Sequence, residues 1–249
     1  MSKLTGKVAV ITGGNSGIGF ATAQAFAGLG AKVIISGRDE AALEKSVAQI
    51  NGEVHAVRAD VTRVSDLDNL FEQTEQTFGR VDILFINAGL VIFNPLGDMS
   101  EENFDTVMNT NFKGAYFTVQ KALPHLNDGA SVILNTSINA HIGMPGSSVY
   151  AASKAALSSL IRTLSAELLE RKIRVNAVSP GPVETPIFGK LGMDEAQTQE
   201  MAAGILEQIP IGRFGKPEEI ASIVAFLASD DAPFIVGTEI TADGGMSQL

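Results

Sequence analysis

The chain alternates between short apolar runs and segments whose apolar residues recur at helical spacing, from its first residues to its last. Seven runs are typical of strands, at 7–13, 31–37, 53–61, 81–89, 130–137, 173–181 and 236–245. Helical patterns separate them at 17–30, 39–52, 64–79, 100–126, 148–172 and 216–230. Strands joined through helices form parallel sheets, and continuously apolar runs such as VAVI and DILFI indicate burial on both faces. We therefore predict an α/β fold with a doubly wound, parallel, seven-stranded sheet and helices on both faces.

The length of the chain suits one large domain. Its 249 residues, 45% of them hydrophobic, can bury a substantial core, and no stretch has the composition of a linker. We therefore predict a single domain spanning residues 1–249. Residues 182–215 depart from the rhythm, because they are rich in proline, glycine and methionine and carry only a weak helical pattern at 194–207. A long insertion of this kind predicts a lid or binding loop.

Composition excludes several kinds of site. Acidic residues outnumber basic ones by 28 to 18, and a formal net charge of −10 disfavours binding to a phosphate backbone. There are no cysteines, and the three histidines are scattered, so we predict no metal site. The apolar runs are too short to span a bilayer, and no signal-peptide pattern follows the N-terminus. We predict a cytoplasmic protein without nucleic-acid or membrane partners.

The segment TGGNSGIG (12–19) lies between the first predicted strand and the first predicted helix. Gly13, Gly17 and Gly19 follow a G-x-x-x-G-x-G spacing, which permits a tight turn and brings backbone N–H groups and a helix N-terminus close to a pyrophosphate. A turn without a ligand is the alternative, but this position after the first strand favours the binding site. We predict that the turn, with Asn15, Ser16 and Ile18, binds a dinucleotide.

Two further strand ends would lie at the same edge of the sheet, where doubly wound folds bind ligands. Asp60, followed by Val61, could accept a hydrogen bond from an adenine amino group, or could cap a turn. Asn87, Ala88 and Gly89 leave room for a ribose, and a plain strand-ending turn is the alternative.

The second predicted strand ends in ISGRD, with Gly37 where an acidic residue would bind the ribose hydroxyls of NAD and repel a 2′-phosphate. Arg38 can bind a phosphate through charged hydrogen bonds. This pair predicts a preference for NADP over NAD. NAD stays the alternative, because Asn15 supplies no second positive charge and GR also fits a turn before a helix capped by Asp39.

The segment YAASK places Tyr150 and Lys154 four residues apart, on one face of a helix. A nearby ammonium lowers the pKa of a tyrosine, which can then exchange a proton with a carbonyl or an alcohol. Such a pair also occurs on plain surfaces. Ser137 ends the fifth predicted strand and could orient a substrate oxygen, or could be a loop serine. Asn111 is a poor residue for the interior of the 100–126 helix, which indicates a functional or a packing position.

Together these motifs resemble the short-chain dehydrogenase/reductase family, in the group with chains near 250 residues. TGGNSGIG, ADV, NAG, the Asn of NTNFKG, Ser137, YAASK, IRVNAVSPG, GKPEEIA and TADGG occur in the family's order over essentially the whole chain. One departure is TSI, where relatives often show two serines. The resemblance implies a Rossmann-type fold and hydride transfer between a nicotinamide cofactor and a carbonyl or secondary alcohol of a small molecule.

The resemblance also implies roles for individual residues. Tyr150 would be the general acid/base, Ser137 would hold the substrate oxygen, and Lys154 would bind the nicotinamide ribose and lower the pKa of Tyr150. Asn111 would support a water in a proton relay. Pro180, Gly181, Val183 and Thr185 would contact the nicotinamide end, and residues 186–205 would cover the substrate.

Family members tend to form tetramers through two long helices, and we predict a homotetramer. The 148–172 helix carries small residues that would permit close helix approach, or ordinary packing on the sheet: Ala151, Ala152, Ala155 and Ala156.

The predicted substrate pocket is mainly apolar, which favours a compact hydrophobic ketone or aldehyde, with sugars and hydroxyacyl thioesters left open. The candidate residues are His141, Ile142, Met144, Ile187, Phe188 and Met193. A redox-neutral isomerase or dehydratase, and a non-catalytic dinucleotide sensor, are alternatives on the same fold. The four intact catalytic positions favour an oxidoreductase.

Overall fold

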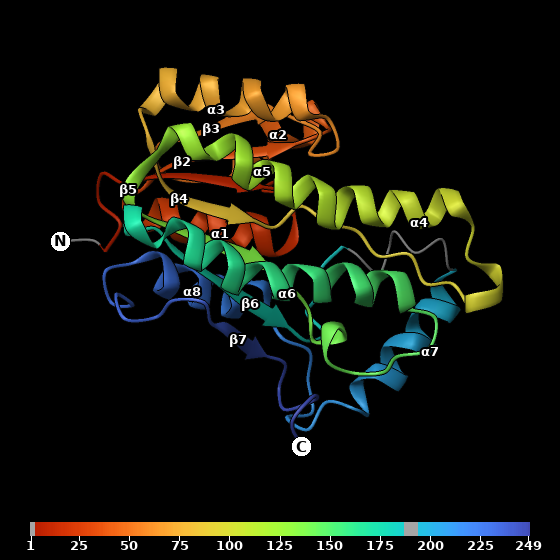
Figure 1. The fold of residues 1–249 in the computed structure, drawn as a ribbon. Coiled ribbons are helices and arrows are strands. Elements are labelled where there is room, and N and C mark those ends of the chain that lie inside the picture. The colour runs from red at the N-terminus through yellow and green to blue at the C-terminus, as the bar shows by residue number, and fades with distance from the viewer. Residues whose placement is uncertain (1–2, 187–193) are drawn as a thin grey trace.

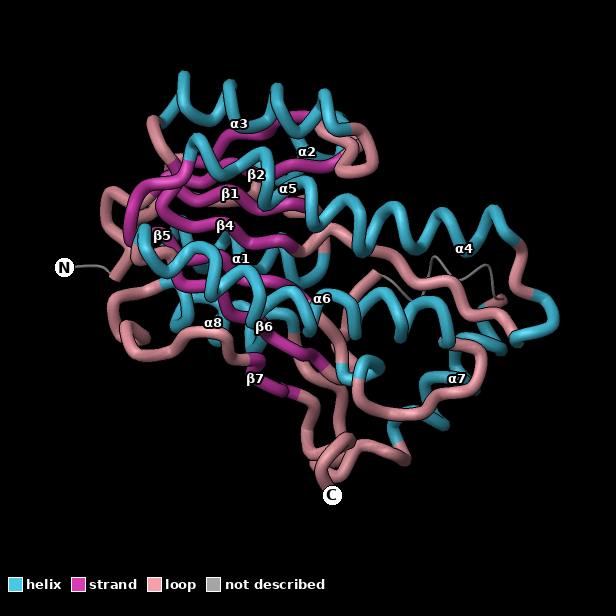
Figure 2. Tube along the Cα trace, viewed as in Figure 1, coloured by secondary structure: helices cyan, strands magenta, loops and turns pink. Residues whose placement is uncertain are grey.

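A parallel sheet of seven strands forms the centre of the computed structural model, which describes residues 3–186 and 194–249 (Figures 1 and 2). The strand order is β3-β2-β1-β4-β5-β6-β7. The strands are β1 (Val8–Thr12), β2 (Lys32–Gly37), β3 (Val54–Arg58), β4 (Val81–Ile86), β5 (Leu126–Asn135), β6 (Arg174–Pro180) and β7 (Glu239–Ala242). All seven predicted strands are present, so the predicted fold class is confirmed.

The strand order reverses next to β1. The chain runs outward from β1 to β3 and then crosses back, so that β4 pairs with the other side of β1. The connections after β1 and β4 therefore leave in opposite directions and open a crevice at the carboxyl ends of these strands. Crevices of this kind are where doubly wound sheets bind their ligands.

Helices cover both faces of the sheet (Figure 1). One core lies between the sheet and α3 (Val64–Phe78), α5 (Gly114–Ala122) and α6 (Ser148–Leu168). The other lies between the sheet and α1 (Gly17–Gly28), α2 (Glu40–Val47) and α8 (Pro217–Ala228). Successive residues of β1 pack into opposite cores: Val10 belongs to the first and Ile11 to the second. Burial on both faces explains why the strands are apolar throughout.

The predicted helix at 100–126 is present, but it is not a regular α-helix throughout. It consists of α4 (Glu101–Met108), a π-helical turn (Asn109–Lys113), α5 and a short 3-10 helix (Leu123–His125). The π turn surrounds Asn111, whose side-chain amide bonds to the backbone N–H and C=O of Leu90. The side chain of Asn111 is therefore used for a contact with a distant segment, at a π turn of the kind often found at functional sites.

Other local predictions are confirmed. Asp39 caps α2, as predicted, by accepting from the backbone N–H of Ala42. Ser100 caps α4 in the same way, by accepting from the backbone N–H of Asn103. The weak pattern at 194–207 forms α7 (Glu195–Leu206), which opens with a capping box between Asp194 and Gln197. No helix in the described part of the chain is long and apolar enough to cross a membrane.

Candidate active site

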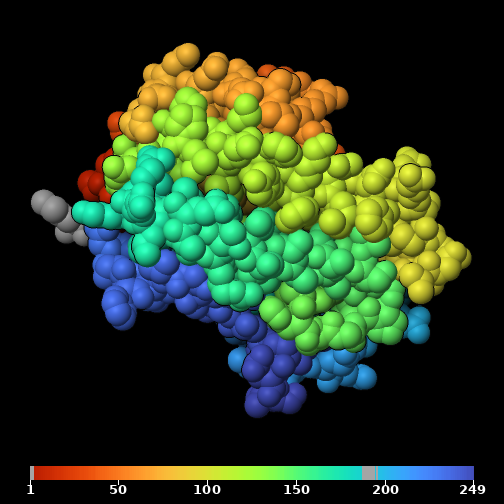
Figure 3. Space-filling model, in the orientation of Figure 1, coloured from red at the N-terminus to blue at the C-terminus, as the bar shows by residue number. Residues whose placement is uncertain are grey.

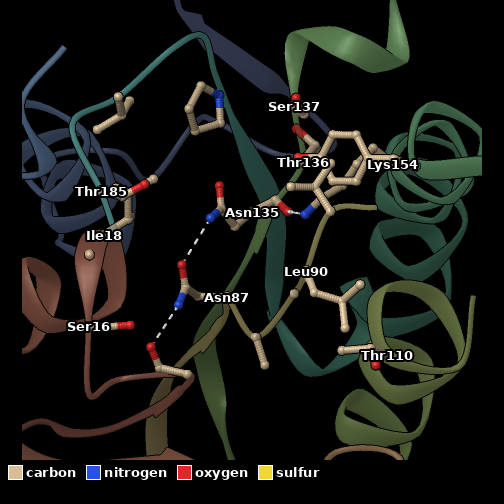
Figure 4. A pocket seen from close by; sticks show the side chains of 18 of the residues that line it. Ser16, Ile18, Asn87, Leu90, Thr110, Asn135, Thr136, Ser137, Lys154 and Thr185 are labelled. Carbon is tan, nitrogen blue, oxygen red and sulfur yellow. Dashed lines mark hydrogen bonds between the residues drawn. The ribbon is translucent and has the colours of Figure 1, made fainter. Parts of the chain in front are cut away.

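A cavity of about 520 Å³ opens at the carboxyl ends of the strands (Figure 4). It collects residues from segments that are far apart in the sequence. The predicted site residues that line it are Gly13, Asn15, Ser16, Gly17, Ile18, Gly37, Arg38, Asp60, Val61, Asn87, Ala88, Gly89, Ser137, Met144, Tyr150, Lys154, Pro180, Gly181, Val183 and Thr185.

The glycines of the first turn each meet a steric requirement. Gly13 and Gly17 have positive φ angles of +64° and +52°. Gly19 does not line the cavity, but a Cβ at this position would lie 2.2 Å from the carbonyl oxygen of Gly13. Ser16, at the N-cap of α1, makes no side-chain cap, and the first turn of the helix holds no acidic residue. The first N–H groups of α1 therefore lie beside the cavity without a side-chain partner. Such groups can bind an anion such as a pyrophosphate.

A chain of side-chain hydrogen bonds joins the turn after β4 to its two neighbouring strands. The hydroxyl of Thr12 accepts from the backbone N–H groups of Asn87 and Ala88, at 3.0 and 3.1 Å. The Asn87 amide donates to the carbonyl oxygens of Thr12 and Gly13 and accepts from Asn135 at 2.9 Å (Figure 4). Sequence reasoning missed both residues. Thr12 opens the segment TGGNSGIG but received no role of its own, and Asn135 belongs to no motif that indicates a site.

Gly37 and Asn15 lie together at the end of β2. A Cβ at Gly37 would lie 2.9 Å from the side-chain oxygen of Asn15. Arg38 follows, with an exposed side chain at the rim of the cavity. A positive side chain at this rim fits a phosphate group on the adenosine ribose.

Asp60 caps its own turn, the alternative noted from the sequence. Its Oδ1 accepts from the backbone N–H and the hydroxyl of Thr62, at 3.0 and 2.8 Å. Burial raises the pKa of the Asp60 carboxyl and is the largest single effect. The hydrogen bonds from Thr62, with the charges of Arg38 and Arg63, outweigh it and hold the pKa below its usual value. Asp60 is therefore an ionised group beside Arg38.

Ser137, Tyr150 and Lys154 come together at the cavity. Ser137 precedes a short 3-10 helix (Ile138–Ala140), while Tyr150 and Lys154 lie on consecutive turns of α6. The hydroxyl of Tyr150 faces the side chain of Ser137. The Lys154 side chain is buried, and its Nζ donates to the carbonyl oxygen of Asn135 at 2.7 Å. The same Nζ lies 5.8 Å from the centre of the Tyr150 ring.

Burial controls the pKa values of both groups on α6. It raises the pKa of the Tyr150 hydroxyl and outweighs the Ser137 hydrogen bond, which lowers it. Burial also lowers the pKa of Lys154 to about 8. The lowered pKa that the spacing predicts for Tyr150 is not found in this structure, because burial of the phenol has the larger effect and raises the pKa.

Asn111 stands behind the cavity wall and is 1% exposed. Besides Leu90, its amide donates to the hydroxyl of Ser153 on α6 at 3.1 Å. A Cβ at Gly89 would lie 3.2 Å from Asn111 Oδ1 and 3.6 Å from Lys154 Nζ. Asn111 and Lys154 therefore both lie next to the backbone of Gly89. Through its hydrogen bonds, Asn111 also joins the loop after β4 to α6.

Only some of the residues predicted for the substrate pocket line the cavity. Met144 lines the cavity, but His141 and Ile142 are not among its described lining residues, and Ile187, Phe188 and Met193 lie outside the described residues. His141 instead places its Nε2 2.8 Å from a carboxylate oxygen of Glu239. Sequence reasoning missed several apolar lining residues: Leu90, Val91, Ile92 and Phe93 after β4, and Met246 near the C-terminus. Met201 and Ile205 on α7 also line the cavity, and both belong to the segment expected to cover the substrate. The apolar run LVIF directly after NAG was the available signal.

Known proteins resemble this chain in both sequence and fold. Residues 13–247 match the family model described as enoyl-(acyl carrier protein) reductase. An oxidoreductase of Sarocladium schorii is 41% identical, over 100% of this chain and 99% of its own length. A 3-oxoacyl-[acyl-carrier-protein] reductase of Thermotoga maritima is 40% identical, over 98% of this chain and 99% of its own length.

Solved structures agree with these relatives. The crystal structure of levodione reductase superposes with a TM-score of 0.93 at 33% identity, covering 98% of both chains. A short-chain type dehydrogenase/reductase from Mycobacterium marinum superposes with a TM-score of 0.91 at 33% identity, over 99% of this chain and 98% of its own. The chain is therefore an oxidoreductase that belongs to the short-chain dehydrogenase/reductase family, which implies a nicotinamide cofactor.

Proposed function

We propose that this protein interconverts a carbonyl and a secondary alcohol of a small neutral molecule, with NADPH preferred and Tyr150 as the general acid/base. The neighbouring hydroxyls of Ser137 and Tyr150, together in one cavity with a buried Lys154, carry the proposal. Two hydroxyls beside one lysine can hold a carbonyl oxygen and deliver a proton to it.

The direction of the pKa shift favours the acid role. Because burial raises the pKa of Tyr150, the phenol keeps its proton at neutral pH and can donate it to a carbonyl oxygen held by Ser137. Lys154, with a pKa of about 8, is mostly charged at pH 7 and stabilises the tyrosinate that the donation leaves. Asn111 would hold the water that returns a proton through Lys154. The bound nicotinamide cofactor supplies the hydride.

The cavity residues divide among the parts of the cofactor. The first glycine turn would hold the pyrophosphate, Arg38 the 2′-phosphate and Asp60 the adenine. Asn87, Ala88 and Gly89, with Lys154, would hold the nicotinamide ribose. The remaining contacts, to the nicotinamide end, would come from Pro180, Gly181, Val183 and Thr185.

The rest of the cavity suits an uncharged, apolar substrate. Among the described lining residues the charged ones are Arg38, Asp60 and Lys154, all assigned above to the cofactor or the proton transfer. Leu90, Phe93 and Met201 are typical of the remaining surface. A compact hydrophobic ketone or aldehyde matches this lining, because a charged group would lose its hydration without gaining a partner. Residues 182–215, including α7, would cover it.

Replacing Tyr150 with Phe tests the proposal. The variant keeps the ring but lacks the proton donor, so we expect turnover to fall by about 10³-fold or more while NADPH binding changes little. Turnover would be followed by nicotinamide absorbance on a panel of ketones, aldehydes and an oxoacyl thioester. Binding would be measured by NADPH fluorescence. Turnover retained in the variant would contradict the assignment of Tyr150.

The same panel separates the alternatives. A redox-neutral product from wild-type protein would indicate an isomerase or dehydratase. NADPH binding without conversion of any compound would indicate a sensor. A cytoplasmic location and a homotetrameric assembly stay predictions.

A further inference from the structure

Glu239 begins the edge strand β7 with its side chain turned toward α6. Its register partner on β6, Ala177, belongs to the core beneath α6, whereas the next residue of β7, Ile240, packs into the opposite core. The Glu239 side chain is 16% exposed. A carboxylate this close to the core needs donors to offset its lost hydration.

Three donors from two segments, the stretch 136–141 and helix α6, meet this carboxylate. Oε1 accepts from the hydroxyl of Ser158 at 2.9 Å and from the hydroxyl of Thr136. Oε2 lies 2.8 Å from Nε2 of His141. Hydrogen bonds to an ionised acceptor are about twice as strong as neutral ones. Both oxygens therefore hold their partners in place.

Each donor lies close in sequence to a proposed catalytic residue. Thr136 directly precedes Ser137, and its backbone N–H donates to the carbonyl oxygen of Val178 on β6. Ser158 is one turn beyond Lys154 on α6, and its hydroxyl also contacts the Lys154 carbonyl oxygen at 3.2 Å. His141 directly follows the 3-10 helix that begins after Ser137. Glu239 thus joins the strand end that carries Ser137 to the helix that carries Tyr150 and Lys154.

We propose that Glu239 is a positioning residue, which holds the end of β5 and helix α6 at the separation needed for Ser137 and Tyr150 to act on one oxygen. This inference rests on the proposed function of the cavity. Catalytic hydroxyls lose much of their effect when they are misplaced by about 1 Å, so a hydrogen-bonded brace between their two supports has a direct kinetic consequence.

Three variants test the brace. Glu239→Leu removes all three hydrogen bonds with little change in volume. Glu239→Gln keeps an oxygen for Thr136 and Ser158, while its amide nitrogen can donate to His141. Asp82→Leu is the matched control, because Asp82 accepts from the backbone of Val8 and the amide of Asn127, at 2.9 and 3.0 Å, at the opposite end of the sheet.

We expect Glu239→Leu to lower kcat by about tenfold or more, to leave the NADPH dissociation constant within about twofold, and to be rescued largely by Glu239→Gln. Asp82→Leu should reduce the melting temperature and leave kcat near the wild-type value. Assays would be run well below the melting temperature of each variant. A kcat for Glu239→Leu equal to that of Asp82→Leu would overturn the proposal, as would a Glu239→Gln variant as impaired as the Leu variant.

A second readout does not depend on turnover. The chain holds two tyrosines and no tryptophan, so a Tyr116→Phe background isolates Tyr150. The ¹³C chemical shift of the Tyr150 ring carbon that bears the hydroxyl depends on the hydrogen bonding of that hydroxyl, and therefore on its placement against Ser137. Glu239→Leu should move this resonance, and Asp82→Leu should not. An unmoved resonance in Glu239→Leu would overturn the proposal about Glu239, whether or not the wild-type protein is active. Failure of the wild-type protein to reduce any carbonyl in the panel would count against the proposed function alone.

Discussion

At the residue scale, the properties of the site depend on where a side chain is buried more than on which side chain it is. Lys154 is of a residue type that is usually exposed, but burial lowers its pKa to about 8. Tyr150 has its pKa raised by the same cause. Neither shift could be obtained from the spacing in YAASK, because spacing does not specify solvent exposure.

The Lys154 pKa predicts how stability depends on pH. The pKa of this lysine is 10.5 in the unfolded chain and about 8 in the folded chain, because burial disfavours the charged form. Folding therefore favours the neutral lysine. Between pH 8 and 10.5 the cost of burying the charge is therefore relieved as pH rises. We expect wild type to gain roughly 2–3 kcal/mol of unfolding free energy over Lys154→Met between pH 7 and 10. Urea unfolding of both proteins at several pH values measures this, and parallel pH curves would contradict it.

Gly37 and Arg38 predict cofactor choice. In Gly37→Asp the new carboxylate would bind ribose hydroxyls and repel a 2′-phosphate, while the Asn15 side chain turns aside to make room. We expect wild type to show a higher kcat/KM with NADPH than with NADH, and the variant to reverse this order, with a change in the ratio of about tenfold or more. Steady-state kinetics with both cofactors provide the measurement. A wild-type preference for NADH would refute the assignment.

At the element scale, the site depends on close contacts between helices and the strand ends beneath them. Helix α1 approaches the end of β1 so closely that Gly19 leaves no room for a side chain. The π turn around Asn111 similarly joins the α4–α5 segment to the loop after β4. A helical pattern in the sequence could predict both helices, but not the interruption, because the partner atoms belong to Leu90.

Gly19→Ala tests the contact of α1 with the first turn. The added methyl would lie 2.2 Å from the Gly13 carbonyl oxygen, so the helix must move away from the turn. We expect a loss of about 1–3 kcal/mol in unfolding free energy, with weaker cofactor binding. Gly28→Ala in the same helix is the control, since its Cβ would meet no atom within 4 Å and should be neutral or stabilising. Equal denaturation midpoints for the two variants would contradict the expectation.

At the scale of the whole molecule, the reversal of strand order at β1 brings the turns after β1, β2, β4 and β5 to one cavity. The outer face of α6 stays open to solvent on the opposite side from its core residues (Figure 3). Ala152 and Ala155 are exposed there, whereas Ala151 and Ala156 are partly buried. Small exposed residues on a long helix suit close approach by a second copy.

The predicted tetramer leads to a test on this face. An arginine in place of Ala155 would put a bulky charge between closely packed helices, so we expect Ala155→Arg to yield a smaller assembly than wild type. Ala41→Arg, at an exposed alanine on α2, is the control and should leave the assembly unchanged. Light scattering coupled to size exclusion gives the masses. A tetramer that persists in Ala155→Arg, or a monomeric wild type, would contradict the prediction.

The sequence by itself determined the fold class and most of the cavity lining. Periodicity reports burial on one or both faces of an element, and Gly13, Ser137 and Tyr150 lie in local motifs whose spacing is readable without a structure. Parallel strand ends must share an edge of the sheet, so these motifs were expected to meet.

Only the tertiary structure decided how these residues behave. Glu239 lies far along the chain from Thr136 and Ser158, and no local pattern links them. The raised pKa of Tyr150, the apolar LVIF wall of the cavity and the turning of His141 away from it also arise from contacts between distant segments. Such properties depend on distance and burial in space, which the order of residues along one chain does not specify.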